Sequence, residues 1–421
     1  MIQVSFHGAM EEVGRSAFLV DTGIEKIVLD YGTKLRETPP LFPMPIKTKP
    51  DCILLSHCHL DHSGGVPIFS ANGDSVPIFA IDPTRSLTEL LLYDSVKISH
   101  EEGIHLPFDD EDVMNTIKAF VPTKYRKPFK LKKSEVTYFD AGHIPGSAMI
   151  HLNFGKKSLL YTGDFNTVDT RLLKKADTNL PDVNYLVTES TYAQREHPPR
   201  EGVEKELVEL IEETISKDGI CLITGFAIQR LQEILVSMSK RGIDYPVYLD
   251  GMAKKATTII NKHKELLREP NALDKALEKV QYVNSEKQRK KIIKNPCAIL
   301  TTSGMLTGGA VVWYLKKLHD QQNSSLFLTG FQLEDTPGKN LLETGMFIHK
   351  NISLEVNMFV KRFDFSGHVG RTGLFDFIKK INPEKVFCIH GDHTEEFAQE
   401  LRDKGYNAVA PVANNRTFDL H

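Results

Sequence analysis

The sequence predicts an α/β protein, and two patterns carry this prediction. Up to about residue 190, short apolar runs of strand length alternate with turns, as at 27–29, 52–56 and 159–162. From about residue 200, strand-like runs alternate with helical periodicity, which is typical of a parallel sheet covered by helices. The elements expected there are a helix over 203–216, a strand over 220–224, a helix over 228–239, a strand over 385–389 and a helix over 395–404.

The composition is that of an ordinary globular chain. Of the 421 residues 41% are apolar and 25% are charged, which excludes disorder as the main state. At about 150 residues per domain, two or three domains are expected. The 52 basic and 55 acidic side chains leave a net charge of −3, which excludes binding of a polyanion through bulk charge but leaves a local basic surface open.

Cysteine usage favours a cytoplasmic protein. The five cysteines are odd in number and lack C-x-x-C spacing, which is typical of reduced thiols. The first residues predict a strand rather than a signal peptide. Residues 297–315 carry no formal charge, but their three glycines indicate a buried strand and a Gly-rich turn rather than a membrane span.

Five acidic or histidine side chains directly follow strand-like runs. They are Asp30, His57, Asp164, Glu189 and His390. In layered α/β folds, ligands gather beyond the carboxyl ends of the strands. We therefore expect these side chains to share one cleft.

Residues 56–65, which read Ser-His-Cys-His-Leu-Asp-His-Ser-Gly-Gly, give the strongest chemical signal. Three histidines and an aspartate at this density suit zinc or a similar transition metal. On a loop, His57 and His59 can bind one ion while Asp61 and His62 turn to another. A solvated polar loop is the alternative, but three histidines in so short a run are rare by chance.

The run H-x-H-x-D-H after a strand resembles the signature of the metallo-β-lactamase superfamily. Three further residues match other motifs of that family in order: Asp30 the first, His143 the third and Asp164 the fourth. The resemblance implies that Asp30 supports a metal ligand and that the carboxylate of Asp164 bridges two metal ions.

Later motifs resemble those of the β-CASP nucleases within this superfamily. The three extra motifs of that group match Thr-Glu-Ser-Thr-Tyr at 188–192, Phe-Ser-Gly-His at 365–368 and Ile-His-Gly-Asp at 389–392. Members that process DNA usually lack a metal-binding histidine in the last of these motifs. His390 therefore points to the ribonucleases of the group, which include the cleavage and polyadenylation specificity factor endonuclease and RNase J.

Other stretches are also similar to this group, at 12–16, 225–233, 302–309 and 329–332. Two positions depart from the group's pattern: Gln229 stands where Gly is common, and Glu334-Asp335 stands where Glu-Gly is common. Both positions fall in the part of the chain that the resemblance assigns to the β-CASP domain.

The resemblance implies an αββα metallo-β-lactamase sandwich with an inserted α/β β-CASP domain that contains a parallel sheet. The expected limits are 1–190 for the first part of the sandwich, 191–362 for the β-CASP domain and 363–421 for the return to the sandwich.

Together with side-chain chemistry, the resemblance implies a site with two zinc ions, manganese being the alternative. The expected ligands are His57, His59 and His143 for one ion, Asp61, His62 and His390 for the other, and Asp164 between them. The expected catalytic residues are His368 as general acid, Glu189 as the group that orients it, Asp61, and Asp30 as hydrogen-bond acceptor for a ligand histidine. The expected RNA contacts are Ser366, Ser303, Gly304 and Arg230.

The predicted function is zinc-dependent hydrolysis of single-stranded RNA by metal-activated water, with internal cleavage and 5′-to-3′ degradation both open. Two basic stretches, at 124–133 and 287–294, either follow the RNA backbone or form solvated faces. A small-molecule metallohydrolase and an inactive RNA-binding subunit of a processing complex are the alternatives. No membrane partner is expected, and a homodimer stays open.

Overall fold

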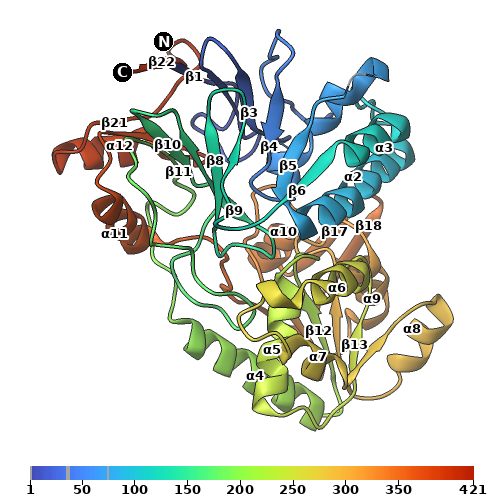
Figure 1. The fold of residues 1–421 in the computed structure, drawn as a ribbon. Helices are drawn as coiled ribbons and strands as arrows, with labels where there is room; N and C mark the ends of the chain where they lie inside the picture. Colours follow the sequence, from blue (N-terminus) through green and yellow to red (C-terminus); the bar gives the residue numbers. More distant parts are fainter. Residues whose placement is uncertain (1, 35–37, 74) are drawn as a thin grey trace. The chain divides into compact units, whose positions relative to one another are not determined.

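The computed structural model describes residues 2–34, 38–73 and 75–421, which form two compact units (Figure 1). The first unit comprises Met1–Asp169, Lys175–Glu196 and Gly367–His421, and the second comprises Thr170–Lys174 and His197–Ser366. These limits differ by a few residues from the expected boundaries at 190 and 362.

Polar contacts join the short stretch 170–174 to the rest of the second unit. Arg171 forms an ion pair with Glu204 at 2.6 Å, and Arg268 donates a hydrogen bond to the carbonyl oxygen of Thr170 at 2.9 Å. Neither contact follows from the local sequence, since the partners lie 33 and 98 residues apart.

The first unit contains two seven-stranded sheets. The first sheet has the order β22 (Thr417–Leu420), β1 (Ile2–Phe6), β2 (Ala17–Asp21), β3 (Lys26–Tyr31), β4 (Cys52–Leu54), β5 (Ile78–Ile81), β6 (Phe120–Thr123). The second has the order β21 (Ala408–Val409), β20 (Lys385–Ile389), β11 (Tyr185–Glu189), β10 (Ser158–Tyr161), β9 (Ala148–Asn153), β8 (Glu135–Asp140), β7 (Phe129–Lys130).

Helices cover the outer faces of these sheets. Beside β4, β5 and β6 lie the helices α2 (Asp82–Glu102) and α3 (Asp110–Lys118), while α11 (Arg371–Ile381) and α12 (Thr394–Asp403) lie beside the other sheet (Figure 1). Two short elements, α1 (Leu60–Ser63) and the 3₁₀ helix η1 (Val66–Gly73), follow β4. The layers are thus α, β, β and α, as predicted.

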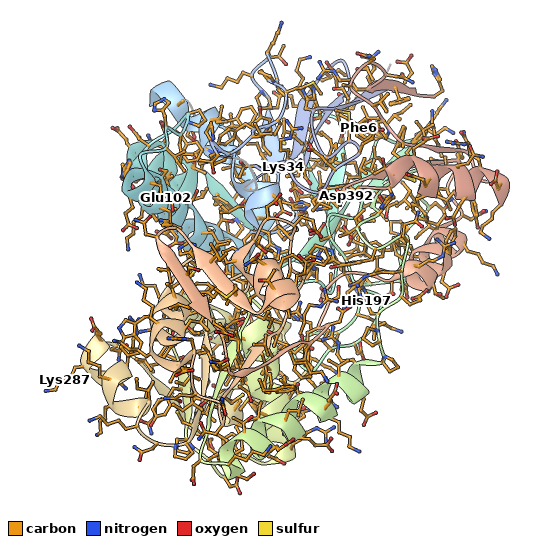
Figure 2. The ribbon with its side chains drawn as sticks, turned by 180° about the vertical axis from the view of Figure 1, so that it is seen from behind. Phe6, Lys34, Glu102, His197, Lys287 and Asp392 are labelled. Atoms are coloured by element: carbon orange, nitrogen blue, oxygen red, sulfur yellow. The ribbon has the colours of Figure 1, made fainter. Side chains whose placement is uncertain are left out.

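Aromatic side chains hold the two sheets together. Phe6 on β1, labelled in Figure 2, has its ring centroid 5.3 Å from that of Phe387 on β20, and Phe18 on β2 lies 5.2 Å from Tyr161 on β10. All four side chains are fully buried. Such pairs bury a large apolar area and stabilise the sandwich by about 0.5–1.5 kcal/mol each beyond that burial.

The second unit is built on a parallel six-stranded sheet. Its order is β14 (Val280–Tyr282), β13 (Val247–Leu249), β15 (Cys297–Thr301), β12 (Ile220–Thr224), β16 (Ser325–Leu328), β19 (Phe359–Arg362). The other elements are α4 (Arg200–Ser216), α5 (Arg230–Arg241), α6 (Ala253–Lys262), η2 (Lys264–Leu266), α7 (Ala272–Leu277), α8 (Glu286–Ile292), α9 (Ala310–Leu318), α10 (Pro337–Thr344) and the hairpin β17 (Met346–His349) with β18 (Ile352–Glu355).

The elements predicted from the sequence are confirmed, with shifts of one to three residues at helix ends. The helix expected over 203–216 is α4, and the strands expected over 220–224 and 385–389 are β12 and β20. The uncharged segment 297–315 begins with the buried strand β15, as expected, and ends in α9. Within the part of the chain that the structure describes, no helix is both long and apolar enough to span a membrane.

The basic stretch at 124–133 uses its aromatic residues in the fold. Tyr125 donates a hydrogen bond to the carbonyl oxygen of Ser147 at 2.7 Å, and Phe129 stacks on Phe79 with 4.8 Å between ring centroids. Its strand β7 is the last of its sheet, where lysines discourage pairing with another chain. These contacts favour a solvated face over base stacking for this stretch.

The stretch at 287–294 is partly structural as well. Arg289 forms an ion pair with the buried Asp250 at 2.7 Å, and Lys290 pairs with Glu286 within α8 at 2.8 Å. Lys287 points outward from α8 (Figure 2) and is exposed. Only part of this charge is therefore placed to meet a ligand.

Candidate metal centre

The carboxyl ends of the first unit's strands carry the predicted polar residues. In the second sheet β10, β11 and β20 run parallel, so that Asp164 after β10, Glu189 at the end of β11 and His390 after β20 all lie at one edge. In the first sheet β3 and β4 are also parallel, so that Asp30, near the end of β3, and the loop from His57, after β4, lie at one edge as well. The structure thus brings both halves of the predicted cluster into one unit.

The first ligand group consists of three imidazole nitrogens and one carboxylate oxygen. Nδ1 of His59 lies 3.2 Å from Nε2 of His57 and 3.2 Å from Nε2 of His143. Oδ2 of Asp164 lies 3.6 Å from Nε2 of His57 and 3.7 Å from Nε2 of His143. These are the histidines that the sequence assigned to one ion.

The second ligand group meets the other oxygen of the same carboxylate. Oδ1 of Asp164 lies 3.3 Å from Nε2 of His62 and 3.7 Å from Nε2 of His390. Nε2 of His390 in turn lies 3.6 Å from Oδ2 of Asp61. The carboxylate of Asp164 therefore faces one group with each of its oxygens.

The spacing and the hydrogen bonding of these atoms fit metal ions. Two nitrogens bound about 2.0–2.1 Å from one tetrahedral zinc ion lie roughly 3.3 Å apart, close to the separations in the first group. In the second group, Nε2 of His62, Oδ1 of Asp164 and Nε2 of His390 are buried and have no hydrogen-bond partner among the described residues. Buried polar atoms are normally satisfied, so three converging exceptions fit a site that can bind a metal ion.

The second ring nitrogens of four histidines are held by hydrogen-bonding groups. The partners of Nδ1 are Ser56 Oγ for His57 (3.0 Å), Asp30 Oδ2 for His62 (2.7 Å), the carbonyl oxygen of Gly367 for His143 (2.9 Å) and Ser16 Oγ for His390 (2.9 Å). In metal sites, such partners fix the tautomer and leave the inward nitrogen free to bind an ion.

Burial and neighbouring charges shift the pKa values of the cluster in opposite directions. Burial lowers the pKa of His57, His59 and His143, which favours the neutral imidazoles that bind metals. Burial also opposes charge on His62, but the carboxylates of Asp164 and Asp30 outweigh it and raise its pKa. For Asp164, burial is outweighed by nearby imidazoles such as His62, which hold its pKa well below the usual range.

His368 and Glu189 form a pair beside the cluster. Nδ1 of His368 lies 3.0 Å from Oε2 of Glu189 and 3.9 Å from Oδ2 of Asp164. Burial opposes the charged imidazole, but Glu189 and Asp164 raise the pKa of His368 to about 9. Oε1 of Glu189 also accepts a hydrogen bond from the backbone N–H of Phe165 at 2.8 Å, so Glu189 fixes both His368 and the segment that carries Asp164.

Three residues at the site were not predicted from the sequence. Ser16 contacts His390, Tyr161 donates a hydrogen bond to Asp30 at 2.6 Å, and the ring of Tyr192 lies 5.7 Å from that of His368. Ser16 and Tyr192 lie in stretches that resemble the β-CASP group, which was their only signal. Nothing in the local sequence marks Tyr161.

The four residues predicted to contact RNA all lie in the second unit. Arg230 is only 6% exposed and packs against Gly225, and a Cβ on Gly304 would lie 3.1 Å from the carbonyl carbon of Gly225. The carbonyl oxygen of Ser366 accepts a hydrogen bond from Arg200. Ser303 lies in the loop after β15.

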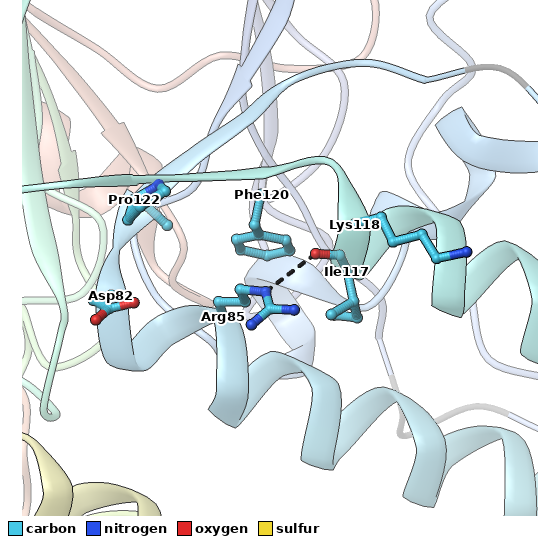
Figure 3. Close-up of a pocket in the computed structure, with 7 residues that line it drawn as sticks. Asp82, Arg85, Ile117, Lys118, Phe120 and Pro122 are labelled. Atoms are coloured by element: carbon cyan, nitrogen blue, oxygen red, sulfur yellow. Dashed lines mark hydrogen bonds between the residues drawn. The ribbon is translucent and has the colours of Figure 1, made fainter.

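A groove of about 250 Å³ lies elsewhere on the first unit, between α2 and the strands β5 and β6 (Figure 3). Its wall includes Arg85, whose Nε donates a hydrogen bond to the carbonyl oxygen of Ile117 at 3.2 Å. It contains none of the metal-cluster residues.

Three family models match successive parts of the chain. Residues 12–190 match a metallo-beta-lactamase superfamily domain, residues 228–341 a Beta-Casp domain, and residues 353–411 a Zn-dependent metallo-hydrolase RNA specificity domain. The fold and the histidine-rich centre thus define the class of metallo-β-lactamase-type metallohydrolases.

Several archaeal proteins are similar over nearly the whole chain. "Probable RNase MJ4" of Methanocaldococcus jannaschii is 38% identical, with 97% of this chain and 98% of the relative covered. "RNase aCSPSF2" of Saccharolobus solfataricus is 36% identical (96% and 82% covered), and "Transcription termination factor FttA" of Methanosarcina mazei is 34% identical (93% and 67% covered). The chain belongs to the β-CASP group of the metallo-β-lactamase superfamily.

One solved structure shows the same fold at low identity. It is the crystal structure of a protein of unknown function from Enterococcus faecalis V583, with a TM-score of 0.62, 14% identity and full coverage of both chains.

Proposed function

We propose that this protein is a metal-dependent ribonuclease that hydrolyses phosphodiester bonds of single-stranded RNA. The observation that carries the proposal is the shared carboxylate of Asp164, whose two oxygens each face one group of histidines. Relatives with RNase names, similar over nearly the whole chain, support RNA as the substrate.

One ion would be held by His57, His59 and His143, and the other by Asp61, His62 and His390. Asp164 would bind both ions. Two bound ions would supply a nucleophilic hydroxide at neutral pH and stabilise charge on the phosphate. The chemistry of this donor set suits zinc, and manganese is the alternative.

The protein's own residues prepare the reaction in three ways. Asp30 holds the Nδ1 proton of His62, so that Nε2 faces the centre. Asp61 is the most exposed ligand carboxylate, at 32%, and is placed to accept a hydrogen bond from the attacking water. The pair of His368 and Glu189 acts on the leaving group.

We assign His368 as the general acid. Its Nδ1 proton is held by Glu189 at 3.0 Å, which leaves Nε2 to donate a proton to the leaving 3′ oxygen of the ribose. Its side chain is 22% exposed, whereas that of Glu189 is 1% exposed, so the imidazole and not the carboxylate is accessible to a substrate. Glu189 is thus a positioning residue.

In the second unit, Ser366, Ser303, Gly304 and Arg230 remain the proposed contacts to RNA. The RNA specificity domain matched by residues 353–411 supports RNA binding, and zinc is the metal in that domain's description. All five cysteines are free and buried, which supports a reducing compartment, the cytoplasm.

The test is cleavage of one RNA labelled at either end, with zinc or manganese added to metal-free protein. Progressive shortening from one end would show exonucleolytic cleavage. Internal products seen with both labels would show endonucleolytic cleavage. Asp164→Asn should abolish cleavage, while Asp376→Asn, which changes an exposed carboxylate on α11, should retain it. Equal cleavage by wild type and Asp164→Asn would refute the proposal.

A further inference from the structure

One tripeptide occurs twice at the carboxyl edge of the second unit's sheet. Thr224-Gly225-Phe226 stands at the end of β12, and Thr329-Gly330-Phe331 follows its parallel neighbour β16. The two copies lie at the same level, since the N–H and Oγ1 of Thr329 donate hydrogen bonds to the carbonyl oxygen of Thr224 at 2.9 and 2.7 Å. Two phenylalanines therefore leave the sheet from adjacent strands.

Both glycines allow close packing at this edge. A Cβ on Gly225 would lie 2.8 Å from Oγ1 of Thr329, too close for a substitution without movement. A Cβ on Gly330 would lie 3.3 Å from Cε2 of Phe226. The ring of Phe226 thus rests against the neighbouring copy of the tripeptide.

The two rings are exposed, which is unusual for phenylalanine. Phe226 is 40% exposed and Phe331 is 43% exposed. Among the residues that the structure describes, only one other phenylalanine, Phe359 on β19, is exposed to this degree, at 51%. Two partly exposed apolar rings at the ends of adjacent strands mark a site of interaction.

The position within the sheet favours a ligand. From β12 the chain crosses to β13 on one side of it. From β16, the neighbour of β12 on the other side, the chain continues in the opposite direction to β19. In open parallel sheets, ligands bind in the crevice where the chain's direction across the sheet reverses, beyond the carboxyl ends of the strands. The loop after β15 reaches the same place, since Gly304 packs against Gly225 and the N–H of Phe226.

The surrounding charge indicates bases rather than phosphates as the contacted groups. Glu334 and Asp335 follow Phe331 closely, and the nearby Lys339 is paired with Glu334 at 3.1 Å and with Glu343 at 2.9 Å. Arg230 also packs against Gly225, but it is only 6% exposed. The exposed surface of the loop therefore offers little attraction to a phosphate, but aromatic rings stack on any nucleobase.

We propose that Phe226 and Phe331 form a stacking site for the bases of single-stranded RNA, an inference that rests on the proposed ribonuclease function. Each ring is partly exposed at the edge of the sheet, Phe226 by 40% and Phe331 by 43%. Because every base has a π-face, the site would hold RNA without reading its sequence.

Binding to uncleaved RNA tests the inference. The full chain carrying Asp164→Asn would be titrated with labelled oligoadenylate and with an abasic strand of the same number of phosphates. Adding Phe226→Ala or Phe331→Ala should weaken oligoadenylate binding about 5-fold to 150-fold, the range for one stacked base. Binding of the abasic strand and the slope of affinity against salt should not change, because no phosphate contact is lost.

Matched variants identify the cause. Phe359→Ala removes an equally exposed ring from the same unit and should leave oligoadenylate binding unchanged. Phe331→Tyr should retain affinity, whereas Phe331→Leu, which keeps apolar area without a π-face, should not. Unfolding temperatures of all variants would show that the fold is intact.

Three results would overturn the inference. Equal loss on abasic and oligoadenylate strands would mean that the rings do not contact bases. Unchanged RNA binding with an altered association state would identify the patch as a contact between copies of this chain. Unchanged RNA binding while the wild type still cleaves RNA would refute the stacking site alone, whereas failure of the wild type to cleave or bind RNA would refute the proposed function with it.

Discussion

Oδ2 of Asp30 lies 2.7 Å from Nδ1 of His62, although the two residues are 32 positions apart in the sequence. Asp30 is fully buried and also accepts hydrogen bonds from the N–H of Ser56 (2.7 Å), from Ser56 Oγ (2.6 Å) and from the hydroxyl of Tyr161 (2.6 Å). This set of donors fixes the carboxylate, and the carboxylate fixes the imidazole whose Nε2 faces Asp164. A buried carboxylate is thus placed to influence a metal ion bound at this centre through one histidine.

The first prediction concerns Asp30→Asn. The amide keeps the shape of the carboxylate but loses its charge and turns an N–H₂ group toward groups that donate hydrogen bonds. We expect metal affinity to fall about 10-fold to 100-fold, the usual effect of losing such a partner. The measurement is a titration of zinc against a competing chelator.

Asp21→Asn is the control for this change. Asp21 lies in the same unit on β2, where it pairs with Lys26 at the surface, so its loss should leave metal affinity unchanged. An Asp30→Asn variant that binds zinc as tightly as wild type would show that the hydrogen bond to His62 does not support a metal ligand.

The second prediction concerns metal removal. In metal-free protein, the buried nitrogens of His62 and His390 and an oxygen of Asp164 have no hydrogen-bond partner among the described residues. Because only the folded chain brings these atoms together, zinc should bind the folded state and not the unfolded state. At a zinc concentration 100 times the dissociation constant, this linkage stabilises the fold by about 2.7 kcal/mol, or several degrees in unfolding temperature. Asp164→Asn should reduce this increase, and an undiminished increase would place the bound zinc elsewhere.

The sequence could predict which side chains converge at the candidate metal centre because their signal is local. His57, His59, Asp61 and His62 lie within six residues, and Asp164 and His390 each follow a strand that its apolar run predicts. The sandwich layers and the parallel sheet of the second unit followed from the same periodicity and from the family resemblance.

The supporting contacts could not be predicted, because they join distant parts of the chain. Ser16 meets His390 across 374 residues, and Tyr161 meets Asp30 across 131. Composition also cannot tell whether an aromatic ring is packed or exposed: Phe129, in a basic stretch, is packed against Phe79, while Phe226, in an apolar one, is exposed.

The third prediction concerns Gly32→Ala. Gly32 lies directly under the ligand loop, and a Cβ there would lie 1.7 Å from the carbonyl oxygen of Asp61 and 2.5 Å from the backbone nitrogen of His62. The loop must move to make room, which displaces two expected ligands. We expect loss of one metal ion per chain and at least a hundred-fold loss of RNA cleavage, since displacements of about 1 Å have effects of that size.

Gly202→Ala provides the matched control, because a Cβ at this position in α4 meets nothing within 4 Å. Alanine is also the better helix former by about 1 kcal/mol, so this variant should be as stable as wild type or slightly more so. Elemental analysis and the cleavage rate of both variants give the answer. Full metal content in Gly32→Ala would contradict the assignment of Asp61 and His62.

The last prediction separates the proposed general acid from a group that only positions the substrate. A 3′ ribose oxygen is a poor leaving group that needs a proton, whereas p-nitrophenolate leaves without one. His368→Ala should therefore lose about a hundred-fold to ten-thousand-fold on RNA but far less on bis-p-nitrophenyl phosphate, with unchanged metal content. Glu189→Gln should show the same asymmetry in milder form, because Glu189 acts through the 3.0 Å contact with His368. Since Glu189 also holds the N–H of Phe165, loss of metal in this variant would instead indicate a role in placing Asp164. Equal losses on both substrates would mean that His368 positions the phosphate or the ions, and an undiminished rate on RNA would remove it from the mechanism.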